Sequence, residues 1–218
     1  VMVNGVCPAA GFSVVPDDIG GTRAALNYLR ELGHSRIAYC GPLPCFCREE
    51  RDSRDIRDIG LEVDVMISHS SLTDRYRTYM AEMKRFKLPP FVDENTELDT
   101  AEEYLRKTVF EKGVTAILAY GHMGALNLMQ AAHSLGIAVP DELSLMCFCD
   151  EYANRVMSPG LTFMDLCSRQ MGNVAAELLL KQIARPGRIK PERIILQEKL
   201  IIRGTTAPPR QVPTISLH

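Results

Sequence analysis

Residues 114–150, VTAILAYGHMGALNLMQAAHSLGIAVPDELSLMCFCD, decide the fold of this chain. Residues 114–120 form a continuous apolar run, which is typical of a parallel strand covered on both faces. Residues 121–135 repeat apolar side chains with a helical period, and Gly136 ends that repeat. Residues 143–148 form a second apolar run. This order of strand, helix and strand predicts a βαβ unit.

The same alternation continues on both sides of this unit. Further helices are predicted after the capping residues Asp17 and Asp18, from Asp74 to the Pro89-Pro90 stop, from the Thr100/Glu103 capping box to about 111, and over 171–183; further extended segments are predicted at 36–40 and 194–202. We therefore predict an α/β fold with a doubly wound, mostly parallel sheet. Ligands bind such sheets beyond the carboxyl ends of the strands. This places the candidate positions just after Cys40, Tyr120 and Phe148.

Composition excludes several classes of protein. The 218 residues carry 25 Lys and Arg against 27 Asp and Glu, and 46% of them are hydrophobic, which is typical of a globular chain of one large or two small domains. A net charge of −2 argues against a chain that binds nucleic acid by itself, because phosphate binding needs clustered cations. No apolar run approaches the ~20 residues that span a bilayer, so no membrane partner is expected.

Seven cysteines with no CxxC pair do not suit a disulfide-stapled secreted scaffold, so a cytoplasmic location is expected. The two Cys-Phe-Cys triplets, 45–47 and 147–149, differ from common zinc spacings, and we predict neither a metal nor a cofactor. The chain begins Val1-Met2 without a signal peptide, and it is expected to be a fragment of a longer protein.

Residues 42–73 interrupt the alternation. They contain the densely charged stretch REERDSRDIRD at 48–58. Mixed charge of this density favours a solvated helix face or a loop. A lid or docking insertion over the strand ends is the alternative interpretation.

Seven segments in order resemble the LacI/GalR family of bacterial transcriptional regulators. They are DIGGTRAALNYLRELGHSRIA (18–38), RYR (75–77), AILA (116–119), GIAVPDELS (136–144), SPGLT (158–162), MGNVAA (171–176) and LIIRGTT (200–206). The segment at 75–77 lacks the glycine that follows the arginine in the family. The resemblance covers most of the chain apart from the insertion and the tail.

The resemblance implies a non-enzymatic effector-sensing module with a periplasmic-binding-protein-like fold, in which two subdomains enclose a small, sugar-like molecule. It implies that 1–34 and 165–190 are the remnant of the first subdomain. Residues 35–164 and 191–206 form the second subdomain, and 207–218 form a loose tail. It also implies a full-length homodimer that contacts operator DNA through an N-terminal domain missing from this chain. A periplasmic solute receptor of the same fold is the alternative.

The resemblance also implies which residues bind the effector. Arg77 takes the place of the family's ligand-binding arginine, since a guanidinium donates two hydrogen bonds to hydroxyls or a carboxylate; a surface salt bridge to Asp74 or Glu82 is the alternative. The other predicted ligand-binding positions follow the strands: Gly121, His122, Cys149, Asp150 and Leu166.

Three of these positions, Gly121, Cys149 and Leu166, replace polar residues that are common in the family. Desolvated hydroxyls without partners cost about 1–3 kcal/mol each. We therefore expect ordinary sugars to bind weakly or not at all. A Cys149–His122 pair would also suit a cysteine-dependent hydrolase, because imidazole lowers a thiol pKa, but no oxyanion-hole signature accompanies it. His34 is expected to have a structural role.

Overall fold

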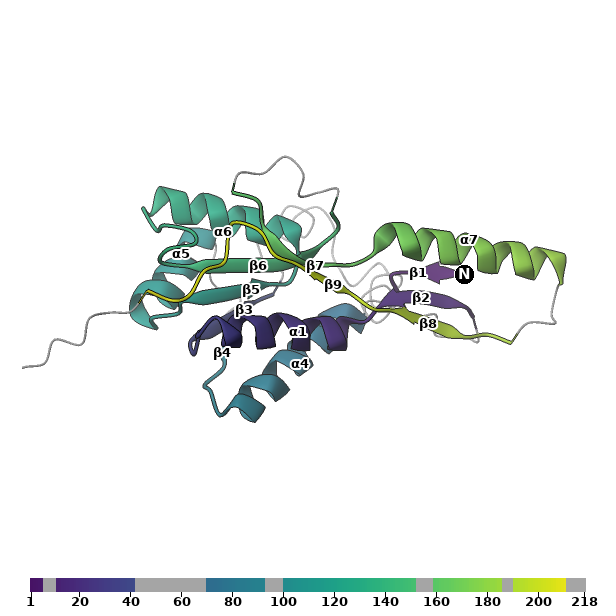
Figure 1. The fold of residues 1–218 in the computed structure, drawn as a ribbon, viewed down its shortest axis with the longest axis horizontal. Coiled ribbons are helices and arrows are strands. Elements are labelled where there is room, and N and C mark those ends of the chain that lie inside the picture. The colour runs from purple at the N-terminus through teal and green to yellow at the C-terminus, as the bar shows by residue number, and fades with distance from the viewer. Residues whose placement is uncertain (6–10, 42–69, 93–99, 152–158, 186–189, 211–218) are drawn as a thin grey trace, which may run out of the picture.

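The computed structural model describes residues 1–5, 11–41, 70–92, 100–151, 159–185 and 190–210. These residues form two sheets, which lie at opposite ends of an elongated molecule (Figure 1). The smaller sheet has the order β1-β2-β8, with β1 (Met2–Val3), β2 (Ser13–Pro16) and β8 (Arg193–Leu196) all parallel. The long helix α7 (Ser168–Ala184) covers one face of this sheet.

The larger sheet has the order β4-β3-β5-β6-β7-β9. Its strands are β3 (Ile37–Cys40), β4 (Phe91–Val92), β5 (Ala116–Ala119), β6 (Ser144–Cys149), β7 (Thr162–Asp165) and β9 (Lys199–Ile201). The first five strands in that order are parallel, and only β9 runs antiparallel, along β7. The predicted α/β class with a doubly wound, mostly parallel sheet is confirmed.

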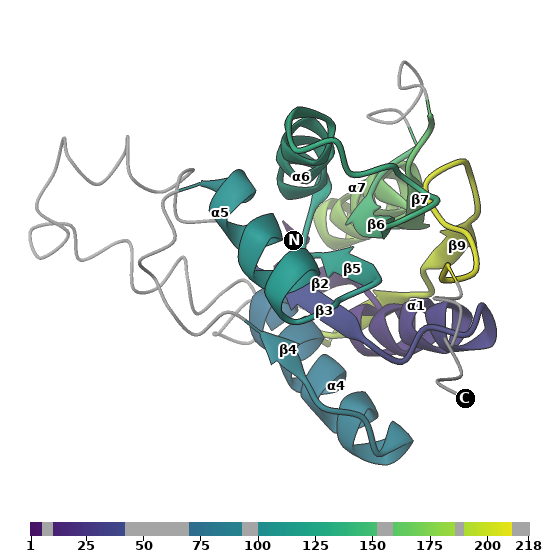
Figure 2. The ribbon, with the colours of Figure 1, turned by 90° about the vertical axis from the view of Figure 1, so that its left-hand side faces the viewer.

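Helices cover both faces of the larger sheet (Figure 2). One face packs against α1 (Asp18–Glu31) and α4 (Ser70–Phe86). The other face packs against α5 (Ala101–Leu105), which continues as the π-helical stretch η2 (Arg106–Glu111), and α6 (His122–Ser134). Neighbouring strand residues point to opposite faces. Tyr39 and Phe148 therefore face α1 and α4, whereas Cys40 and Cys149 belong to the cluster under α5 and α6.

The chain passes between the two sheets three times. It crosses from β2 to α1 at Asp17, from β7 to α7 at 166–167, and from β8 to β9 at 197–198. These crossings correct the predicted subdomain boundaries. Helix α1 packs on the larger sheet although 1–34 was assigned to the first subdomain, and β8 joins the smaller sheet although 191–206 was assigned to the second. These boundaries were missed because a crossing inside a short extended segment does not change the periodicity of the apolar residues around it.

Several element boundaries also differ from the sequence prediction. Helix α4 begins at Ser70 rather than at Asp74, so the predicted insertion 42–73 overlaps its first turn, and residues 42–69 lie outside the described residues. The predicted extended segment 194–202 is two strands in different sheets. The cap at Thr100 is confirmed, since its hydroxyl accepts the amide hydrogen of Glu103 over 3.1 Å.

The start of the predicted loose tail is held against the larger sheet. The carbonyl of Ala207 accepts hydrogen bonds from His34 Nε2 and from the Ser144 hydroxyl, each over 2.9 Å. The His34 Nδ1 atom lies 2.9 Å from the hydroxyl of Thr115. These contacts correct the tail prediction for 207–210, while 211–218 lie outside the described residues. The buried His34 is structural, as expected.

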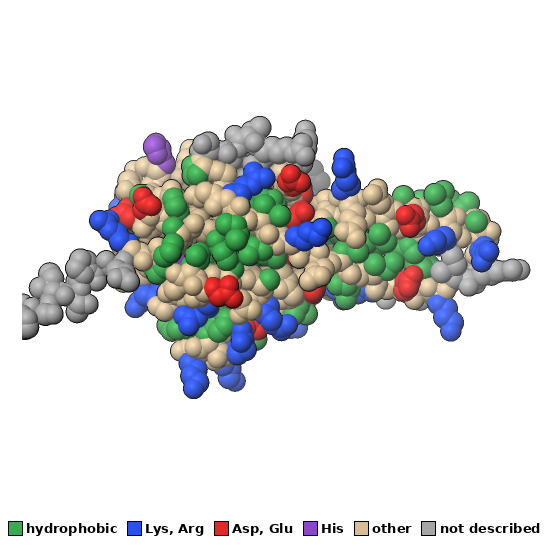
Figure 3. Space-filling view, in the orientation of Figure 1, with side chains coloured by type: hydrophobic (Ala, Val, Ile, Leu, Met, Phe, Trp, Pro, Cys, Tyr) green, Lys and Arg blue, Asp and Glu red, His purple; other side chains and the backbone are tan. Residues whose placement is uncertain are grey.

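The part of the surface formed by α7 and the smaller sheet carries hydrophobic side chains (Figure 3). Leu179, Leu180 and Ile183 of α7 are each about half exposed or more, at 49%, 66% and 67%. None of the described helices combines the length and the apolar composition needed to cross a lipid bilayer.

Candidate functional site

A buried ion pair lies where the larger sheet meets the first crossing. Arg75, in the second turn of α4, donates from Nε to Oδ1 of Asp18, the first residue of α1, over 2.7 Å. Its Nη1 also donates to the carbonyl of Tyr120, immediately after β5, over 2.7 Å. The arginine therefore joins α4, α1 and the carboxyl end of β5 in one contact.

Aromatic rings hold the arginine from the side of the sheet. The guanidinium carbon of Arg75 lies 3.9 Å from the ring centre of Phe148 and 4.9 Å from that of Tyr120. A guanidinium over an aromatic face is attracted to the ring, and more strongly where water is excluded. Burial raises the pKa of Asp18, and the charge and hydrogen bond of Arg75 oppose that change. The ion pair is thus largely withdrawn from water.

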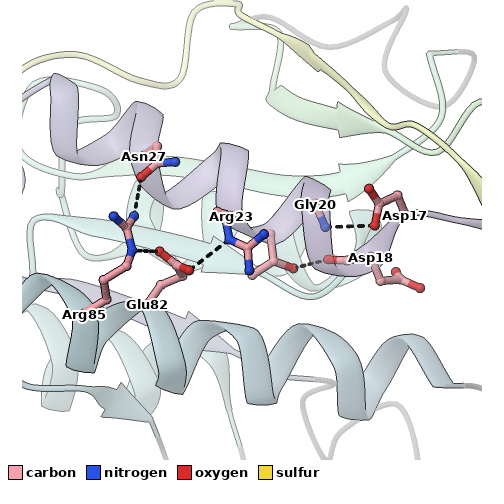
Figure 4. Close-up of polar contacts among 8 residues, drawn as sticks. Asp17, Asp18, Gly20, Arg23, Asn27, Glu82 and Arg85 are labelled. Atoms are coloured by element: carbon pink, nitrogen blue, oxygen red, sulfur yellow. Dashed lines mark hydrogen bonds and ion pairs between the residues drawn. The ribbon is translucent and has the colours of Figure 1, made fainter.

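The first turn of α1 is fixed by its own cap. Oδ1 of Asp17 accepts the amide hydrogen of Gly20 over 3.0 Å, and the hydroxyl of Thr22 donates to the carbonyl of Asp18 over 2.7 Å (Figure 4). A side-chain acceptor at this position satisfies an amide that has no partner within the helix. The predicted capping role of the two aspartates is therefore fulfilled by Asp17, which leaves the Asp18 carboxylate for Arg75.

On the outer side, α1 and α4 are joined by a second polar network. Glu82 of α4 accepts from Arg23 of α1 over 3.0 Å and from Arg85 of its own helix (Figure 4). Arg85 also donates to the side-chain oxygen of Asn27 over 2.9 Å. This network fixes the two helices relative to each other and so supports the position of Arg75.

Glu198 lies at the third crossing and is unusual for a carboxylate. Its side chain is only 6% exposed, and neither oxygen has a hydrogen-bond partner among the described residues. Its Oε2 lies against α1, because a Cβ added to Gly21 would be 1.8 Å from it. Burial and the charges of Asp18, Asp17 and Asp165 raise the pKa of Glu198 to about 8, against the opposing charge of Arg75.

A cavity of about 600 Å³ opens beside the crossings. It is lined by residues that follow β6 and β7, by the first turns of α7 and by the start of β9: Asp150, Glu151, Asp165, Cys167, Ser168, Arg169, Gln170, Asn173 and Lys199. The cavity therefore touches both units, the larger sheet through its strand ends and the smaller sheet through α7.

The structure places the predicted ligand-binding Arg77 on the exposed side of α4. It lines a separate cavity of about 460 Å³ together with Tyr39, Gly41 and Tyr76. The alternative partner Glu82 contacts Arg23 and Arg85 instead. Residues two apart are about 200° apart around a helix, so Arg75 and Arg77 point in nearly opposite directions.

The structure brings the other predicted positions to one edge of the sheet but gives them different surroundings. Gly121 is the N-cap residue of α6, and His122 follows it with a buried Nε2 that has no partner among the described residues. The side chain of Cys149 is buried in the apolar cluster under α6. Asp150 lines the cavity of about 600 Å³, and Leu166 packs between the cores of the two units.

The thiol of Cys147 is poorly suited to act as a nucleophile. The neighbouring Cys149 thiol and burial raise the pKa of Cys147 well above its ordinary value. The four described cysteines, Cys40, Cys147, Cys149 and Cys167, are buried and form no disulfide with one another. Cys45 and Cys47 lie outside the described residues. Within the described ranges, no group of three His, Cys, Asp or Glu side chains is arranged to hold a metal ion.

Sequence reasoning missed three residues of this site. Arg75 stood in the same motif as Arg77, and its signal was the apolar face that it shares with Tyr79 and Met83, both buried under the sheet. Asp18 was predicted only as a cap. Glu198 gave no signal, because a charged residue in an extended segment is usually exposed.

Comparison with known proteins identifies a domain family and several regulators that are similar to this chain. The sequence model of the periplasmic binding protein-like domain matches residues 26–206. An uncharacterized HTH-type transcriptional regulator of Streptomyces limosus is 27% identical, over 89% of this chain and 50% of that protein. The chain spans about half the length of such curated relatives.

Solved structures agree with this result. A LacI-family transcriptional regulatory protein from Corynebacterium glutamicum matches with a TM-score of 0.71 and 26% identity, over 96% of this chain and 73% of that one. A LacI-family regulator from Enterococcus faecium with bound ribose has the same fold, with a TM-score of 0.72 and 18% identity over 94% and 68% of the two chains. These matches confirm the resemblance that the sequence motifs indicated.

Proposed function

Because the chain belongs to the family of periplasmic binding protein-like domains, we propose that it is the effector-binding module of a LacI-type transcriptional regulator. The relatives above are named as transcriptional regulators, which favours a regulator over a periplasmic solute receptor of the same fold. The regulator acts in the cytoplasm, contacts operator DNA through a segment outside this chain, and works as a homodimer.

One observation carries the proposal, namely the buried contact of Arg75 with Asp18 and Tyr120 at the first crossing. It fixes the carboxyl ends of the larger sheet relative to α1, at the place where the smaller sheet begins. An effector bound in the adjacent cavity of about 600 Å³ touches strand ends on one side and α7 on the other. Its binding therefore differs in strength between the open and the closed arrangement of the two units.

A difference of this kind is what regulation requires. A ligand shifts a conformational equilibrium only by its difference in affinity for the two states. The three crossings at Asp17, 166–167 and 197–198 are the covalent links about which the units rotate. Closure around the effector moves the smaller unit and, with it, the DNA-contacting segment outside this chain. This movement changes the affinity for operator DNA.

The effector is a small, sugar-like molecule that contacts residues at the strand ends of the larger sheet. We assign the ligand-facing arginine to Arg75 rather than to Arg77, because Arg75 faces the crossings. Gly121, His122 and Asp150 contact the effector from the strand ends. The buried Cys149 and the partly buried Leu166 shape the cleft by packing, and neither offers a polar partner to a hydroxyl, so neutral monosaccharides bind weakly.

The full-length protein tests this function. It is titrated in gel-shift assays with the DNA upstream of its own gene, alone and with neutral sugars and their amine derivatives. We expect DNA binding that weakens with salt, and at least one compound that changes the affinity about fivefold or more. A protein that does not bind this DNA at low salt, or that responds to no compound, would contradict the proposal.

Two variants make the assay specific to the site. Arg75→Lys keeps the charge but loses the planar fork, and we expect it to lose most of the effector response while still binding DNA. Arg77→Lys is the matched control on the exposed side of the same helix, and we expect it to respond like the unmodified protein. Equal losses in both variants would argue against the assignment to Arg75.

A further inference from the structure

Acidic residues gather where the chain crosses between the two units. Each crossing contributes an acidic residue: Asp17 precedes α1, Asp165 ends β7, and Glu198 lies between β8 and β9. The three crossings are joined by hydrogen bonds, since Asp17 N donates to the carbonyl of Leu196 over 2.8 Å and Cys167 Sγ donates to the carbonyl of Gln197 over 3.5 Å. The acidic residues are therefore gathered because the chain passes between the sheets at one place.

Most of these carboxylates have a partner. Asp17 caps α1, Asp18 is paired with Arg75, and Oδ1 of Asp165 accepts the amide hydrogen of Cys167 over 3.1 Å. Glu198 differs from them, because it is buried and both of its oxygens lack a hydrogen-bond partner among the described residues.

The nearby cationic side chains do not supply the missing hydrogen-bond partner of Glu198. The charge of Arg75 lowers the pKa of Glu198. The hydrogen bonds of Arg75, however, go to Asp18 and to the carbonyl of Tyr120. Arg169 and Lys199 line the adjacent cavity, but both side chains are exposed and keep their charges in water. A buried carboxylate without a partner is costly to ionise, so it holds a proton unless a cationic group pairs with it.

From this arrangement we propose that the junction of the three crossings, next to the cavity, binds a cationic group of the effector, an ammonium, with Glu198 as its counter-charge. The inference rests on the proposed effector-binding function and names the chemical class of the effector as amine-bearing. An ammonium has three donors and no acceptor, which suits a site with carboxylate oxygens on several sides. A phosphate or carboxylate at the same place would be repelled by Asp17, Asp18 and Asp165.

Access to Glu198 follows from its place in the chain. Residues 197–198 join β8 of the smaller sheet to β9 of the larger one, so rotation of the units moves this segment relative to α1. In the arrangement described here the Glu198 carboxylate lies against α1 and does not line the cavity, whereas the next residue, Lys199, does. An effector that enters the open cleft reaches the carboxylate there, and closure then excludes water from the pair.

Binding of a cation has a direct signature in the protonation of this group. The pKa of Glu198 is raised to about 8, so much of this carboxyl is protonated at neutral pH. An ammonium favours the ionised form, so the pKa falls and a proton is released. The other ionisable groups that face Glu198 are Asp17 and Asp18 of the first crossing and α1, Arg75 of α4 and Asp165 of β7, and their charges are included in this raised pKa.

The test uses the full chain and methylammonium chloride as the probe, with sodium chloride at equal concentration as the reference. The Glu198 carboxyl is followed by NMR on glutamate-labelled protein, and its signal is assigned by its loss in Glu198→Gln. We expect saturable binding of one methylammonium and a fall in the Glu198 pKa that sodium does not reproduce. We expect Glu198→Gln to weaken this binding about tenfold or more.

Two controls separate the possible outcomes. Glu151→Gln removes an exposed carboxylate of the same cavity, and we expect it to bind methylammonium nearly as well as the unmodified chain. Glu198→Gln is isosteric and removes a buried carboxylate without a partner, so it is expected to fold. A Glu198 pKa that is the same in both salts, or equal losses in both variants, would overturn the cationic effector. Such a result would leave the effector-binding function intact, since the gel-shift response of the full-length protein to the whole set of compounds tests that separately.

Discussion

The guanidinium of Arg75 on α4 donates to the carboxylate of Asp18 on α1 over 2.7 Å, and the two side chains are only 5% and 4% exposed. The pair lies between two helices that cover the same face of the larger sheet, at the point where the chain crosses to the smaller one. Its burial makes it sensitive to the loss of one partner, because the remaining charge cannot reach water.

We predict that Arg75→Ala lowers the free energy of unfolding by about 3–5 kcal/mol, because it leaves Asp18 buried and unpaired. Arg77→Ala, on the exposed side of α4, should change it by less than about 0.5 kcal/mol. Urea unfolding of both variants measures the difference. Adding Asp18→Asn to Arg75→Ala should restore part of the loss, and strictly additive effects would mean that the two side chains do not interact.

Glu198 should make the stability of the chain fall as the pH rises. Its pKa is about 8 in the folded chain against an ordinary value of 4.5, so the folded state holds a proton that the unfolded state has released. This contribution is therefore present below 4.5 and is lost as the pH rises through about 8, at roughly 1.4 kcal/mol per unit in that window. Glu198→Gln lacks it.

This prediction is tested by urea unfolding of the wild-type chain and of Glu198→Gln between pH 4.5 and about 8, which gives the free energy of unfolding of each protein at each pH. The variant should gain stability relative to the wild type with each step toward pH 8. A constant difference between the two curves would show that Glu198 titrates alike in the folded and unfolded states.

The effect of Gly21→Ala on stability should depend on the residue at position 198. A Cβ at Gly21 would lie 1.8 Å from Oε2 of Glu198, so Gly21→Ala must displace the carboxylate and is expected to destabilise the chain. A Glu198→Ala background removes the two closest atoms, Oε2 and Cδ, and leaves only the Cβ of residue 198, at 3.3 Å. There the same change should stabilise α1 by up to about 1 kcal/mol, since alanine is the better helix former. Thermal unfolding of the four proteins measures this coupling, and the same effect in both backgrounds would refute the contact.

His34 should contribute stability that acid removes. Its Nε2 hydrogen bond to the carbonyl of Ala207 fixes the neutral tautomer, in which Nδ1 accepts from the hydroxyl of Thr115. Burial lowers its pKa below 6.5, so this contribution is complete above pH 6.5 and is lost as the pH falls through the lower folded-state pKa. His34→Ala should cost about 1–3 kcal/mol at neutral pH. Urea unfolding at neutral and acid pH should show the cost shrinking in acid, and a cost that grows there would contradict the burial of a neutral ring.

Much of the fold could be predicted from local patterns. The apolar runs that became β5 and β6 are buried throughout, and the caps at Asp17 and Thr100 lie where the sequence placed them. These features depend on neighbours within a few residues. The alternation of strands and helices then restricts the topology to a parallel α/β sheet. The candidate strand ends after Cys40, Tyr120 and Phe148 follow from the same reasoning.

The site could be predicted only in outline, because its residues come from separate parts of the chain. Local patterns were enough to predict the fold class, the helix caps and the sheet edge at which a ligand is expected, since periodicity and capping act over a few residues. Tertiary structure decided that Arg75 rather than Arg77 faces this edge, because the rotation of α4 is set by its packing on the sheet. It also decided that 194–202 divides between two sheets, and that Glu198 is buried where they meet, because burial depends on which distant segments cover a side chain.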